Sequence, residues 1–89
     1  MDLKKFDTIV DNVLVECARQ DAKWGADRVQ HPFLWNTILV EEVGEVAEAS
    51  LAMEYDSTQE NGDNYRAELV QVAAVALQAL LCHDRNFNR

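Results

Sequence analysis

Residues that interrupt helices are scarce in this sequence, which has one proline and three glycines among 89 residues. The alternation of polar and apolar residues that is typical of strands never extends over a useful length. Apolar residues instead recur every three or four positions, which is the period of a helix with one buried face. The sequence therefore predicts an all-α fold of three helices, and its length predicts a single domain over residues 1–89.

The few breaking residues mark the ends of the first two predicted helices. The first helix is expected over about Leu3–Lys23, because Gly25 is a plausible stop just beyond it. The second is expected to begin at Pro32, since the missing N–H of proline is no loss in the first turn of a helix. Its apolar pattern continues to about Tyr55.

The third predicted helix follows the clearest loop of the chain, the polar segment Asp56–Gly62. Asp63 is a reasonable N-cap for this helix, which we expect to run to about His83. The remaining residues, Asp84–Arg89, are polar and are expected to be a frayed tail.

The third helix is apolar on nearly every side over Leu69–Leu81. A helix of this kind belongs in a deep core or an interface, and one layer of two other helices does not cover it. We therefore expect a homodimer with a four-helix bundle-type core across the two subunits, which can pair further into a dimer of dimers. Because the stretch contains Gln71 and Gln78 and is too short to span a bilayer, we expect no membrane partner.

Acidic residues are concentrated in the middle of the chain. The segment Val29–Tyr65 carries eight acids and no Lys or Arg, and the whole chain has a formal net charge of −8. This charge argues against a nucleic-acid partner, which needs a basic patch. Glu42 lies in an apolar helical stripe with Trp35 and Val46, where a carboxylate is costly unless something compensates it. The missing counter-charge therefore predicts a bound cation.

The cysteines and the N-terminus give an expectation about location. Cys17 and Cys82 are too few and too far apart for a disulfide scaffold or a paired-cysteine metal site, and both stand among apolar residues. Free buried thiols fit a reducing cytoplasm. No apolar core of a signal peptide follows Lys4 and Lys5. We therefore expect a cytoplasmic protein.

Two pairs of oxygen-bearing side chains have the spacing of a metal site. Glu42 and Glu45 are three residues apart and project from one helix face, and Glu68 and Gln71 repeat this spacing on the next helix. Two antiparallel helices would bring the pairs together as oxygen ligands, which select Mg²⁺ or Mn²⁺ rather than zinc. The alternative is a solvated, helix-favouring acidic face without a ligand.

At these residues the sequence resembles a known family. Leu39–Ala49, followed by Glu68–Ala73, is similar to the paired motif of the MazG-type all-α nucleoside triphosphate pyrophosphohydrolases, with ExxE on one helix and ExxD on the next. Gln20–Gly25 together with His31–Pro32 resembles small stand-alone MazG-like proteins of bacteria and phages. The resemblance covers about Leu34–Leu81.

The resemblance implies a Mg²⁺-dependent hydrolase that converts a nucleoside triphosphate into a monophosphate and pyrophosphate, for house-cleaning or control of nucleotide pools. It implies Glu42, Glu45 and Glu68 as metal ligands, with Gln71 at the fourth position. One of these carboxylates or the flanking Glu41 would orient or deprotonate the attacking water. Metal ions would bridge carboxylates and phosphate oxygens that otherwise repel each other.

One position departs from the family pattern, because Gln71 stands where the family has aspartate. An amide oxygen can ligate Mg²⁺ but brings no charge and cannot act as a base. Two alternatives to the hydrolase follow: a catalytically weakened relative that binds nucleotide or metal, and an acidic helical interaction protein such as a DNA mimic. The second alternative is supported only by the net charge of −8.

Aromatic residues near the start of the second helix are candidate substrate contacts. Trp24, Trp35 and His31 would stack on the nucleobase or hydrogen-bond to it. The alternatives are core packing for the two tryptophans and helix capping for His31, and we expect packing for Phe33. Lys23 is a candidate contact to the phosphates, as are three further cations that are otherwise surface charges: Arg28, Arg66 and Arg85.

Overall fold

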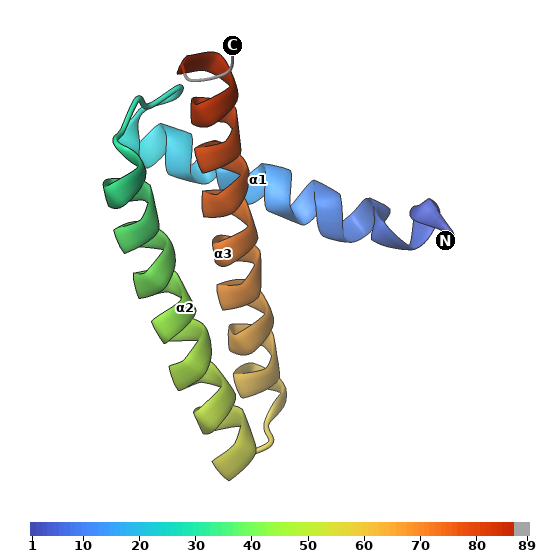
Figure 1. Cartoon of the computed structure of the whole chain (residues 1–89). Coiled ribbons are helices and arrows are strands. Elements are labelled where there is room, and N and C mark those ends of the chain that lie inside the picture. The colour runs from blue at the N-terminus through green and yellow to red at the C-terminus, as the bar shows by residue number, and fades with distance from the viewer. Residues whose placement is uncertain (87–89) are drawn as a thin grey trace.

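The computed structural model describes residues 1–86 and contains no strand among them. A short 3₁₀ helix, η1 (Leu3–Phe6), leads into α1 (Asp7–Trp24), which is followed by α2 (Pro32–Tyr55) and α3 (Gln59–Asn86). Helices α2 and α3 form an antiparallel hairpin, and α1 crosses α3 at an angle with its N-terminal half extending away from the hairpin (Figure 1). The prediction of an all-α protomer with three helices is confirmed.

The N-terminal helix has the expected end and a different beginning. Its first turn is the separate 3₁₀ helix, in which the Asp2 carboxylate accepts a hydrogen bond from the Lys4 N–H. Gly25 ends α1 with a φ of 100°, in the left-handed region that favours glycine. Its N–H donates to the Asp21 carbonyl at 2.8 Å, so the predicted stop at Gly25 is confirmed.

Helix α2 has the bounds that its sequence predicts. Pro32 stands at the first position of the helix, and Tyr55 is the last residue. The His31 side chain is the N-cap, because its Nδ1 accepts a hydrogen bond from the Phe33 N–H at 3.1 Å. Histidine capping was one of the two interpretations of His31, and the structure confirms it.

Helix α3 is longer at both ends than the sequence predicted, and the N-cap at Asp63 was wrong. Thr58 is the effective cap, since its Oγ1 accepts the Asn61 N–H and its carbonyl accepts the Gly62 N–H. The loop is consequently reduced to residues 56–58. At the other end the helix includes Asp84 and continues to Asn86, so this part of the expected tail is helical, and residues 87–89 lie outside the described part.

The core is small and lies between the N-terminal part of α2 and the C-terminal half of α3. Trp35, Val75 and Cys82 form its buried centre. Helix α1 crosses α3 at Ala74, which is 0% exposed and whose carbonyl accepts a hydrogen bond from the Cys17 thiol at 3.7 Å. Both cysteines are free, as predicted; Cys82 is buried, whereas Cys17 is only half-buried.

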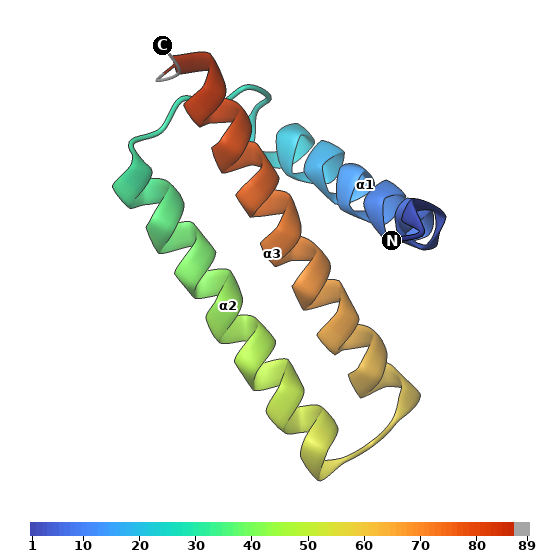
Figure 2. The same cartoon turned by 45° about the vertical axis from the view of Figure 1, so that its right-hand side comes forward.

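A buried polar network fixes the C-terminal end of α1 against α3. Gln78 donates to the Asp21 carboxylate at 2.9 Å and to the Cys17 carbonyl at 3.2 Å. Its own side-chain oxygen accepts a hydrogen bond from Arg28 at 2.8 Å. Because buried amides must be paired, this network places the end of α1 beside the upper half of the hairpin, as Figure 2 shows from the side.

Many large apolar side chains remain exposed in the single chain. On α3 these include Leu69, Leu77, Leu80 and Leu81. Helix α3 is also long and apolar enough, by its length and composition, to cross a membrane. The core helix of a soluble protein passes the same test, so one such helix is weak evidence for a membrane span. Further exposed apolar residues lie on η1 and α1: Leu3, Phe6, Ile9, Val10, Leu14 and Val15.

Candidate metal site

Three carboxylates from the two hairpin helices converge on one point. Glu42 and Glu45 are one helical turn apart on α2, and Glu68 faces them from α3. Each offers one oxygen, and these oxygens lie within 4.8 Å of one another. Glu42 and Glu68 are half-buried and Glu45 is exposed. The antiparallel hairpin thus brings together the three acids that the sequence singled out.

Two oxygens of this triad are buried without a donor. Among the described residues, neither Glu42 Oε2 nor Glu68 Oε2 accepts a hydrogen bond. Burial, together with the neighbouring carboxylates of Glu45 and Glu68, raises the pKa of Glu42. Burial and the nearby Glu45 likewise raise the pKa of Glu68. Orphaned buried acceptors of this kind are uncommon in proteins, and a cation is the partner that would satisfy them.

A fourth acid, Glu16 on α1, acts on the triad through its charge and was not recognised from the sequence. Its charge contributes to the raised pKa of both Glu42 and Glu68. Glu16 forms a two-pronged ion pair with Arg19, at 2.8 Å to Arg19 Nε and 2.6 Å to Arg19 Nη2. Arg19 holds the pKa of Glu16 below its usual range. The only sequence signal was the place of Glu16 between the apolar positions Val13 and Cys17.

The triad forms part of the wall of a cavity that has a volume of about 690 Å³. Gln71 lies in the same wall, one turn after Glu68, so its side chain reaches the region that the sequence predicted. Glu41 also lines the cavity and is exposed. The apolar part of the wall comes from all three helices: Trp24 on α1, Leu34 and Ile38 on α2, and Val75 on α3.

The cations of the cavity come from α1 and the following connector. Lys23 lies with its Nζ 4.8 Å from the centre of the Trp24 ring, and both side chains line the cavity and are exposed. Arg28 also lines it, but its guanidinium is engaged with Gln78 and with the ring of Trp35 at 5.5 Å. Arg19 is the third cation in the wall.

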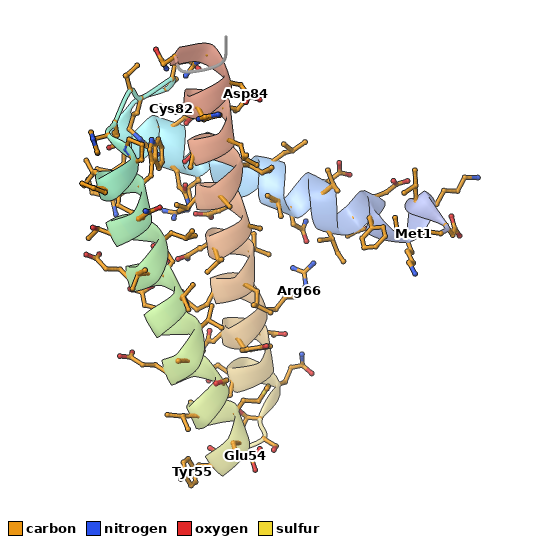
Figure 3. All side chains as sticks on the ribbon, viewed as in Figure 1. Met1, Glu54, Tyr55, Arg66, Cys82 and Asp84 are labelled. Carbon is orange, nitrogen blue, oxygen red and sulfur yellow. The ribbon has the colours of Figure 1, made fainter. Side chains whose placement is uncertain are left out.

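Several predicted contacts lie elsewhere. Trp35 is 5% exposed and belongs to the core, and neither it nor His31 lines the cavity with the triad. The expected packing of Phe33 in the core is wrong, since this side chain is 76% exposed at the start of α2, where its ring lies 4.7 Å from the His31 ring. Two of the candidate phosphate contacts are paired away from the cavity: Arg66 with Asn12, to which it reaches across from α3 (Figure 3), and Arg85 with Asp27 at 2.6 Å.

The donor set fits a hard divalent cation. The converging ligand atoms are carboxylate oxygens, and the neighbouring Gln71 adds an amide that lines the same cavity. Oxygen ligands of this kind suit Mg²⁺ and Mn²⁺. Clusters of exposed acids also occur without an ion, and the two buried orphan oxygens are what separates this triad from such a surface.

Comparisons of this chain with protein-family models, with curated proteins and with solved structures find no match.

Proposed function

We propose that this protein is a Mg²⁺-dependent nucleoside triphosphate pyrophosphohydrolase. The observation that carries the proposal is the pair of buried oxygens, Glu42 Oε2 and Glu68 Oε2, which lack donors among the described residues. They belong to a triad on the wall of a cavity of about 690 Å³, which is within the usual size of a small-molecule site. The resemblance to the MazG-type paired motif agrees with this reading.

The charges of the cavity favour one orientation of a triphosphate. The acidic wall repels phosphates unless a divalent cation lies between them. Lys23 and Trp24 stand on α1, across the cavity from α2, and offer a cation and an exposed aromatic ring. We therefore assign the phosphates to the triad, and the base to the apolar side of the cavity near Trp24.

The acidic residues and Gln71 have separate roles in the proposed reaction. Glu42, Glu45 and Glu68 would hold the cation, and the Gln71 side-chain oxygen would add a neutral ligand. A bound cation neutralises phosphate charge and makes phosphorus more susceptible to attack. Glu41 is exposed in the cavity wall next to Glu42, and we assign it, or Glu42 or Glu45, to accept the proton of the attacking water. The bond between the α and β phosphates is the one that breaks.

We further propose that the chain works as a homodimer or as a dimer of dimers. Support comes from the exposed leucines of α3 and the exposed apolar residues of the projecting half of α1 (Figures 1 and 2). A second copy that covers both would complete a four-helix bundle-type core. The free thiols of Cys17 and Cys82 agree with a cytoplasmic location.

The reaction is tested by ³¹P NMR of the products from a panel of ribo- and deoxyribonucleoside triphosphates, with Mg²⁺ and with EDTA. The proposal expects monophosphate and pyrophosphate, formed only with Mg²⁺. Diphosphate and orthophosphate as products would contradict the assigned bond. Equal rates with EDTA would contradict the role of the cation.

Gln71 favours a second candidate function, in which the protein binds nucleotide and metal without efficient turnover. The reason is that the cavity wall has a neutral amide at Gln71, where the MazG-type motif has a charged aspartate. Calorimetry with a triphosphate and Mg²⁺ separates the two: binding without pyrophosphate release supports the weakened relative. Failure to bind either leaves the acidic interaction protein, for which Glu42 and Glu68 are poorly placed because both are half-buried.

A further inference from the structure

We propose that Glu16 on α1 supplies the cation site with the negative charge that Gln71 does not bring. The inference rests on the proposed function, because it presupposes a divalent cation held by Glu42, Glu45 and Glu68. It adds a residue from the third helix to a site otherwise built by the hairpin.

Contacts between α1 and α3 place Glu16 beside the segment of α3 that holds Glu68 and Gln71. The Arg66 side chain donates to Asn12, and the Cys17 thiol donates to the Ala74 carbonyl, so the contacts follow the same order along both helices. On α1, Glu16 lies between the two contact residues Asn12 and Cys17. On α3, the segment between their partners Arg66 and Ala74 holds Glu68 and Gln71. Glu16 therefore approaches α3 at the height of the position where the charge is missing.

The side chain of Glu16 is buried and oriented by its neighbours. It is only 12% exposed. Gln20, itself 5% exposed and part of the cavity wall, donates its Nε2 to Glu16 Oε2 at 3.0 Å. Arg19 donates to both carboxylate oxygens. A carboxylate oxygen has two lone pairs. The hydrogen bonds from Arg19 and Gln20 use both lone pairs of Oε2, whereas the single hydrogen bond from Arg19 to Oε1 leaves one lone pair there.

The charge of Glu16 persists at the site. Arg19 keeps the Glu16 pKa below its usual range, whereas Glu42 and Glu68 have raised pKa values. The Arg19 side chain is 54% exposed, so water screens its positive charge. The Glu16 side chain is only 12% exposed, and its negative charge raises the pKa of both Glu42 and Glu68. Glu16 thus contributes net negative potential at the triad although it is ion-paired.

Binding of Mn²⁺ alone, measured by the loss of the free-ion EPR signal without nucleotide, tests the proposal. Glu16→Gln should weaken binding by roughly tenfold, the lower end of the effect typical of residues that support a metal site. Glu54→Gln is the control for loss of one negative charge, because Glu54 is an exposed acid at the far end of α2 (Figure 3). Equal affinities of Glu16→Gln and the wild type would overturn the inference.

A rescue experiment tests whether the two positions share one role. In the Glu16→Gln background, Gln71→Asp should restore most of the lost Mn²⁺ affinity, and it should gain less in the wild-type background. Rescue also shows that the Glu16→Gln chain is folded. Gains of equal size in both backgrounds would mean that the two charges act independently, which contradicts the inference.

A double variant separates loss of Glu16 from release of Arg19. Glu16→Gln with Arg19→Gln keeps the net charge of the chain, and it should still bind Mn²⁺ more weakly than the wild type. Wild-type affinity in this double variant would assign the effect to the freed guanidinium and overturn the role of Glu16. If the wild type itself binds no Mn²⁺, the proposed function fails as well; if only the effect of Glu16 is missing, the proposed function stands.

Discussion

Glu42 on α2 and Glu68 on α3 bring carboxylate oxygens within 4.8 Å of each other, and the Oε2 atom of each is buried without a hydrogen-bond donor among the described residues. Two ionised carboxylates at this separation repel each other, and partial burial strengthens the repulsion. The hairpin therefore holds an unfavourable arrangement that a divalent cation would make favourable.

Divalent cations should stabilise the fold. Because a ligand that binds only the native state adds stability, Mg²⁺ or Mn²⁺ at a hundred times its dissociation constant should add about 2.7 kcal/mol. A thermal melt with and without millimolar MgCl₂ and a triphosphate analogue measures this. An unchanged melting temperature in the presence of both would rule out the site at Glu42, Glu45 and Glu68.

The pH dependence of apo stability should follow from the raised pKa values of Glu42 and Glu68. The folded chain binds these protons more tightly than the unfolded chain, so this contribution to stability is present at low pH. It falls as the pH rises above the ordinary value of 4.5 through the raised pKa values. Urea melts at several pH values should show this decline without cations and a smaller decline with Mg²⁺.

Glu42→Gln is the variant that checks the assignment of this pH effect. It removes one of the two groups with a raised pKa and should flatten the decline. Glu16 acts with the opposite sign, since its lowered pKa gives stability that is lost as the pH falls below 4.5. A decline of unchanged slope in Glu42→Gln would show that other groups cause it.

Turnover should depend on the triad and not on acidic charge in general. Glu42→Ala and Glu45→Ala each remove a proposed cation ligand and should abolish pyrophosphate release. Glu54→Ala, at the exposed far end of α2 (Figure 3), should leave it unchanged. Glu42→Ala should also raise the melting temperature of the apo protein, because it deletes a half-buried carboxylate. Equal losses in all three variants would indicate general destabilisation.

The exposed apolar surface predicts self-association. Light scattering at micromolar concentration should give at least twice the chain mass of 10.1 kDa. Replacing two exposed leucines of α3, Leu80→Glu with Leu81→Glu, should shift the protein toward the monomer, because charges are costly in a buried interface. A wild-type monomer would remove the basis for the bundle across two subunits.

The local features of the chain were predictable, because they depend on short-range spacing. Helix geometry predicts that Glu42 and Glu45 share one face of α2. It also predicts the end of α1 at Gly25 and the start of α2 at Pro32. The start of α3 was not predictable in this way. Asp63 and Thr58 are both acceptable caps, and the hydrogen bonds that Thr58 makes decided between them.

Features that depend on how helices cross were harder to predict. The meeting of Glu42 and Glu68 required only an antiparallel hairpin, which the short polar loop favours. The approach of Glu16 depends on the angle at which α1 crosses α3, and helical periodicity carries no information about that angle. Trp35 shares a helix face with Glu42, but the contacts of α3 place it in the core and outside the cavity wall.

The most direct measurement is anomalous diffraction at the manganese edge, from crystals grown with MnCl₂ and a non-hydrolysable triphosphate analogue. The account predicts an anomalous peak between the carboxylates of Glu42, Glu45 and Glu68, with phosphate oxygens on its open side. Well-ordered triad side chains with no peak between them, or a peak only at other acids of the chain, would contradict the central claim that this triad is a catalytic cation site.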